Sequence, residues 1–231
     1  MPSWNIHTAH VERLLRDEGA AALGVRNVDA FLVGNLAPDI YVGYMVPNPT
    51  KKIAYRETHF ADPGFVPEPR YGEFFERFCT PDAQGHVSDV VLGARAHLMA
   101  DNVYNHRNNA FIDAHGILPG EETRVRKQGD FDLFGRTLDI SLVPRIDADV
   151  VAQCAAFPQY AIEERDVRAT AESLARIVAD NAARHVYGTP AYSMLPVDFF
   201  ATTFDEVHER ICRGLKAYAA GDPAWGVPQP W

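Results

Sequence analysis

The stretch Val90–His106, VVLGARAHLMADNVYNH, decides the fold class because it is long, mostly apolar and spaced as a helix. Counting by threes and fours along it gives one stripe of side chains: Val90, Ala94, His97, Asp101 and Tyr104. Leucine, methionine and valine cover the other faces, so the helix is expected to be surrounded by protein. A carboxylate in such surroundings is costly unless it is paired, hydrogen-bonded or bound to a metal.

The rest of the chain has the same helical periodicity, interrupted by Pro-rich passages. Helices are expected at about 7–19, 27–37, 70–79, 87–107, 160–186 and 200–219. Alternating strand and helix signals are missing, so the sequence predicts one all-α domain over residues 1–231, a helical bundle with long Pro-rich loops. Gly188 is the predicted stop of the fifth helix, and Thr202 or Thr203 the predicted cap of the last.

Composition and charge narrow the class of protein. With 47% hydrophobic residues the chain can bury a sizeable core, and its formal net charge of -9 argues against a nucleic-acid-binding surface. No stretch approaches the roughly twenty apolar residues that a membrane span needs, and the amino terminus lacks the features of a secretion signal. A cytoplasmic protein is therefore predicted. Cys79, Cys154 and Cys212 are scattered, which indicates buried free thiols.

Three further segments carry side chains that commonly bind metals. The segment IHTAHVERLL places His7 and His10 on one helix face, DAFLVGNLAPDI ends with Asp39 just after a proline, and RETHFAD carries His59 in a Pro-rich loop region. Each has a simple explanation when taken alone: a core histidine, a turn former and a loop residue. Likewise, an isolated histidine and aspartate at i and i+4 are explained most simply by a buried ion pair, although both can reach one cation.

Together, the segments MPSWNIH, FLVGNLAPD, THF and AHLMADNVYN, in this order, resemble the bacterial cytoplasmic branch of the zinc-dependent phospholipase C family, from residue 1 to about residue 135. The resemblance implies an all-α fold and a cluster of divalent metals that hydrolyses a phosphoester. Matched motif by motif, the implied metal ligands are His7, Asp39, His59, His97 and Asp101. It also implies that Asp39 is the general base and that Asp101 can bridge two metals.

Other polar residues near these motifs are weaker candidates. Asp130 and Asp132, in KQGDFDLFG, lie in a segment similar to a shorter one of the family. Asn105 continues the stripe of His97 and Asp101 and is a candidate to support the ligands, whereas His106 is expected to face away from them. Secreted members of the family bind metal through a processed amino-terminal tryptophan and a later HxxxE pair, and neither has a match here. We therefore expect one or two ions.

The predicted function is a zinc-dependent phosphoester hydrolase in which the metal activates water and Asp39 takes its proton. Manganese, nickel and iron accept the same ligand types. The substrate is expected to be a small phosphoester or a phospholipid, and oligomeric state stays open. Two alternatives remain: a non-catalytic helical protein whose metal stabilises the fold or a partner interface, and a metal-free helical interaction module. The loop aromatics Tyr41, Tyr44, Tyr55 and Phe60 are explained more simply as local core than as a pocket mouth.

Overall fold

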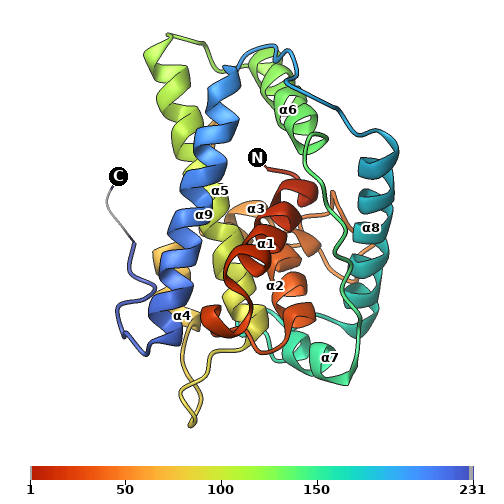
Figure 1. The fold of residues 1–231 in the computed structure, drawn as a ribbon, viewed down its shortest axis with the longest axis vertical. Helices are drawn as coiled ribbons and strands as arrows, with labels where there is room; N and C mark the ends of the chain where they lie inside the picture. The colour runs from red at the N-terminus through yellow and green to blue at the C-terminus, as the bar shows by residue number, and fades with distance from the viewer. Residues whose placement is uncertain (1, 229–230) are drawn as a thin grey trace.

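The computed structural model describes residues 2–228 and 231, and every regular element in that part of the chain is a helix (Figure 1). The elements are α1 (Trp4–Glu18), the 3-10 turn η1 (Ala21–Leu23), α2 (Val28–Ile40), α3 (Tyr55–His59), α4 (Tyr71–Phe78), α5 (Asp89–Ala114), α6 (Glu121–Gly135), α7 (Ala148–Ala155), α8 (Glu164–Ala183) and α9 (Val197–Ala219). The predicted all-α fold is confirmed.

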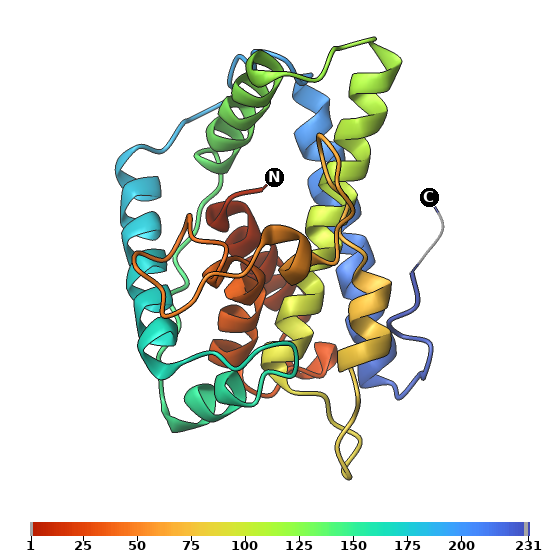
Figure 2. The same ribbon diagram turned by 180° about the vertical axis from the view of Figure 1, so that it is seen from behind.

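Helix α5 is the central element of the fold. It runs along the long axis beside α9, and α1 and α2 pack across its middle (Figures 1 and 2). Every residue from Asp89 to Asp101 is buried, so the helix is surrounded by protein as its apolar stripe predicts. Burial on all faces explains why a helix of 26 residues carries so few charged side chains in its first half.

Helices α2 and α5 approach each other very closely because each presents a glycine at their crossing. A Cβ atom on Gly34 would lie 2.2 Å from the carbonyl oxygen of Val90, and one on Gly93 would lie 2.1 Å from that of Phe31. No other residue fits at either position without moving the backbone. This contact brings the last turn of α2 beside His97, so the packing of the core also positions the candidate site.

Several helix boundaries differ from those predicted. Pro38 does not close α2, which continues to Ile40, so Asp39 lies in the last helical turn rather than in a loop. His59 is on the short helix α3 and not in an irregular loop. A proline near a helix end leaves only one backbone hydrogen bond unmade, which neighbouring packing can offset.

The carboxyl-terminal helices differ as well. Helix α8 begins at Glu164 and ends at Ala183, short of the predicted stop at Gly188. Helix α9 begins at Val197, and Thr202 lies inside it with its hydroxyl donating to the carbonyl of Asp198. Helices α3, α6 and α7 were not predicted. The three cysteines are free and buried, as expected.

Candidate metal centre

The five residues matched to metal ligands come together in the interior from four different helices. His7 lies on α1, Asp39 on α2 and His59 on α3, while His97 and Asp101 lie one turn apart on α5. Four of the five side chains are at most 2% exposed, and Asp39 is 15% exposed. Asp39 is therefore the member of the cluster nearest to solvent.

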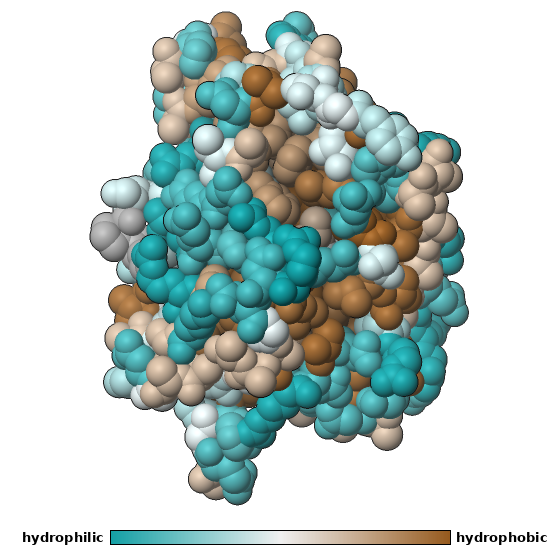
Figure 3. Space-filling model, viewed as in Figure 1, coloured by the Kyte–Doolittle hydropathy of each residue, from teal (hydrophilic) through white to brown (hydrophobic). Residues whose placement is uncertain are grey.

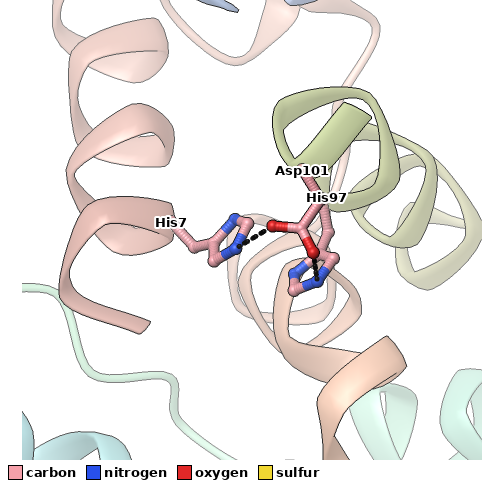
Figure 4. Close-up of side chains that lie close together, drawn as sticks. All are labelled: His7, His97 and Asp101. Atoms are coloured by element: carbon pink, nitrogen blue, oxygen red, sulfur yellow. Dashed lines mark ion pairs between the residues drawn. The ribbon is translucent and has the colours of Figure 1, made fainter. Parts of the chain in front are cut away.

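The ligand atoms form two overlapping groups that share His97. One group is His7, His97 and Asp101, and the other is Asp39, His59 and His97. In the first, Nε2 of His7 lies 3.3 Å from Oδ1 of Asp101 and Nε2 of His97 lies 3.8 Å from its Oδ2 (Figure 4). In the second, Nε2 of His59 lies 3.6 Å from Oδ1 of Asp39. This arrangement has room for one or two cations.

Hydrogen bonds at the outer ring nitrogens orient two histidines. Nδ1 of His97 lies 2.7 Å from the backbone carbonyl of Asn35, which can only accept, so Nδ1 carries the proton. Nδ1 of His59 lies 2.7 Å from the hydroxyl of Thr58 and 3.2 Å from the carbonyl of Tyr55. The hydroxyl can donate its proton to Nδ1 or to that carbonyl, so these contacts hold the ring in place with the proton of His59 on either nitrogen.

The inner ring nitrogens of these two histidines face each other beside the carboxylates. The Nε2 atoms of His59 and His97 are 3.2 Å apart, and Nε2 of His97 carries no proton. Oδ2 of Asp101 and Oδ1 of Asp39 each lie 3.6 Å from Nε2 of His59. Imidazole nitrogens and carboxylates that converge in a buried space form an arrangement that a divalent cation would stabilise.

Burial shifts the pKa of every member of the cluster toward its neutral form. Burial lowers the pKa of His7 to about 3 and that of His59 well below its usual range. Burial also raises the pKa of Asp39 to about 6 and raises that of Asp101. Near neutral pH the imidazoles are therefore neutral, as metal ligands must be.

The donor set fits a divalent cation. Both ring nitrogens of His7 and Oδ1 of Asp101 are buried without a hydrogen bond, although polar atoms in such positions nearly always have one. Three neutral imidazoles and two carboxylates are the ligand types that zinc takes in proteins. The five predicted residues could thus hold one or two ions.

Two residues that were not predicted as site residues hold the carboxylates in place. The indole Nε1 of Trp4 donates to Oδ2 of Asp39 at 3.0 Å. The hydroxyl of Tyr55 donates to Oδ2 of Asp101 at 3.2 Å, and its ring stacks on His59 at 3.8 Å. The signal for Trp4 was its position one helical turn before His7. No sequence pattern indicated that Tyr55 contacts both His59 on α3 and Asp101 on α5.

The weaker candidates lie outside the cluster. The amide of Asn105 donates to the carbonyl of Pro67, and His106 faces away from the cluster toward Glu68. The carboxylate of Asp130 accepts three backbone N–H groups of residues 193–195, which explains its burial by structure alone. Two others also have partners elsewhere, namely His10 with Tyr104 and Asp132 with Gln128.

Comparisons with protein-family models, with curated proteins and with solved structures find no match for this chain. Among the described residues, no helix is both long and apolar enough to cross a membrane. The function must therefore be argued from the geometry of the centre itself.

Proposed function

We propose that the chain is a metal-dependent phosphoester hydrolase of the phospholipase C type and that its metal is zinc. The observation that carries the proposal is the convergence of the Nε2 atoms of His59 and His97, 3.2 Å apart, with two carboxylates beside them. The order of the sequence motifs, which resembles that family, agrees with this chemistry. A divalent ion held there supplies a Lewis acid that acidifies water and stabilises negative charge on phosphoryl oxygens.

Asp39 is the residue placed to accept the proton. Its pKa of about 6, raised by burial, leaves the carboxylate mostly ionised at neutral pH and makes it a stronger base than an exposed aspartate. The indole of Trp4 donates to Oδ2 and so holds the carboxylate in its orientation. Partial exposure of Asp39 also gives water and substrate an approach to this carboxylate.

Asp101 and His7 serve a different purpose, because they lie deeper in the protein. The Tyr55 hydroxyl holds one carboxylate oxygen of Asp101, and the other faces His7. The Nδ1–H group of His97 is fixed by a backbone carbonyl of α2, which keeps its Nε2 aimed into the cluster. These residues therefore bind and orient, and they leave proton transfer to Asp39.

The test combines metal content with turnover. Protein purified without a polyhistidine tag is analysed for zinc, manganese, nickel and iron, and is then assayed against a panel of chromogenic phosphomonoesters and phosphodiesters. We expect at least about one equivalent of metal and hydrolysis that a chelator abolishes. Bound metal without hydrolysis of any ester would favour the non-catalytic metal-binding alternative. Absence of any bound metal would support the metal-free interaction module.

A further inference from the structure

A cleft of about 440 Å³ lies beside the metal centre, between the start of α1, the end of α6 and one face of α8. Figure 1 shows these elements around the first turn of α1. The size of the cleft falls in the range of small-molecule sites. Apolar side chains gather in the middle of the face seen in Figure 3, with hydrophilic residues around them.

Two arginines line this cleft without an acidic partner. Within the part of the chain that the structure describes, the guanidinium of Arg136 makes no ion pair or hydrogen bond, and that of Arg176 donates only to the hydroxyl of Ser173 at 2.9 Å. Of the two aspartates that also line the cleft, Asp180 is paired with Arg184 at 3.0 Å. The other, Asp132, is exposed and accepts from Gln128 at 3.0 Å. Both guanidinium groups therefore remain available to a ligand.

Trp4 lies between the cleft and the metal centre. It is one of the residues around the cleft, its side chain is fully buried, and its indole N–H donates to the proposed general base Asp39 at 3.0 Å. A molecule that extends from the cleft past Trp4 therefore has its reacting phosphoester on the side of Asp39. The remaining part of the molecule lies on the side of Arg136 and Arg176.

We propose that this cleft binds the part of the phosphoester that is not cleaved, and that this part carries a second anionic group, either a carboxylate or a phosphate. Guanidinium groups bind both anions through paired, charge-assisted hydrogen bonds. The inference rests on the proposed hydrolase function and narrows its substrates to phosphoesters with an additional negative charge. A cationic headgroup such as choline is disfavoured by the same two arginines.

The experiment compares p-nitrophenyl phosphodiesters that share a leaving group and differ in the second ester arm. The four arms are ethyl, choline, carboxyethyl and phosphonoethyl, and the enzyme is the metal-loaded full chain. We expect kcat/KM for at least one anionic arm to exceed that for ethyl by about tenfold to hundredfold, because charge-assisted hydrogen bonds are worth that much. The choline ester should be the poorest of the four. The better of the two anionic arms identifies the preferred anion.

Variants separate the cleft from the metal centre. In R136Q/R176Q the ratio of kcat/KM for the anionic arm to kcat/KM for the ethyl arm should fall to within about twofold. The matched control is R168Q, which removes an exposed guanidinium of α8 whose partner Glu164, like Arg168 itself, does not line the cleft, and it should keep the preference. No preference in the natural protein, or a preference that survives in R136Q/R176Q, would overturn the proposal.

The experiments distinguish a failure of the hydrolase proposal from a failure of the proposal that the cleft binds an anionic group. Hydrolysis of all four esters at equal rates leaves the hydrolase in place and removes the anionic subsite. If no ester is hydrolysed, calorimetric titration of the metal-loaded chain with glutarate and with propylphosphonate still tests the cleft. Binding that R136Q/R176Q loses would support an anion site without the hydrolase, and equal or absent binding in both proteins would overturn it.

Discussion

Replacing Asp101 with asparagine tests the role of the more buried of the two carboxylates in the cluster. The substitution keeps the shape of the side chain and removes the negative charge of a carboxylate whose Oδ1 lies 3.3 Å from Nε2 of His7 and whose Oδ2 lies 3.8 Å from Nε2 of His97. We expect the metal-free protein to tolerate the change, because burial already penalises the charge of Asp101 and raises its pKa. The metal-loaded protein should lose stability, because the amide is a much weaker ligand.

The size of the effect follows from binding linkage. A metal at about a thousand times its Kd stabilises the folded state by about 4.1 kcal/mol. If the loss of Asp101 weakens binding by about a hundredfold, the same metal concentration contributes only about 1.4 kcal/mol. The difference of about 2.7 kcal/mol corresponds to about 5–11 °C in Tm for a domain of this size.

The assay is thermal unfolding with and without zinc, with Asp89→Asn as the matched control. Asp89 is a buried carboxylate on the same helix that accepts the backbone N–H groups of Arg26 and Asn27, far from the imidazoles. Its variant should lose the same stability in both conditions, because its bonds do not involve the metal. An equal zinc-induced shift in Asp101→Asn and the natural protein would refute the assignment of Asp101 as a ligand.

Three other predictions follow from the structure. Trp4→Phe removes the hydrogen bond to Asp39 and should lower kcat by about tenfold or more with little change in metal content, measured by steady-state kinetics and elemental analysis. Because burial raises the folded pKa of Asp39 to about 6, metal binding must displace its proton below that pH. Calorimetry in buffers of different ionisation enthalpy should show proton release that grows as pH falls from 7 to about 5, and a flat profile would argue against Asp39 as a ligand. Gly93→Ala should destabilise the protein by several kcal/mol in urea unfolding, because the new Cβ would lie 2.1 Å from the carbonyl oxygen of Phe31. The control Gly129→Ala, on α6 with nothing within 4 Å, should stabilise it by up to about 1 kcal/mol, and equal effects would contradict the close packing of α2 on α5.

The sequence predicted the all-α fold and the pairing of His97 with Asp101 because both depend on helical spacing, whereas the full set of five residues was implied by the resemblance of the ordered motifs to a known family. His97 and Asp101 are four residues apart, so they share one face of the helix, and that face is buried. Other features depend on contacts between distant segments. The donation from Tyr55 to Asp101 exists only because α3 packs on α5, and the closeness of α2 depends on paired glycines.

The missed helices have a physical explanation in their side chains. The segment EETRVRKQG at the start of α6 is polar on nearly every face, and its last residue is a glycine near the middle of the helix. No apolar stripe therefore indicates a helix here. Pro38 was interpreted as a helix stop, although the packing of α2 against α5 extends the helix past it. Tertiary contacts overrode a local rule at Pro38.

The most direct test of the metal centre is anomalous diffraction from crystals of the tag-free protein grown with zinc. We expect one peak at about 2.0–2.2 Å from Nε2 of His97, with either Asp39 and His59 or His7 and Asp101 around it, and, if two ions bind, a second peak at the other pair of ligands. Imidazoles and carboxylates that contact only one another, with no anomalous peak among them, would contradict this expectation.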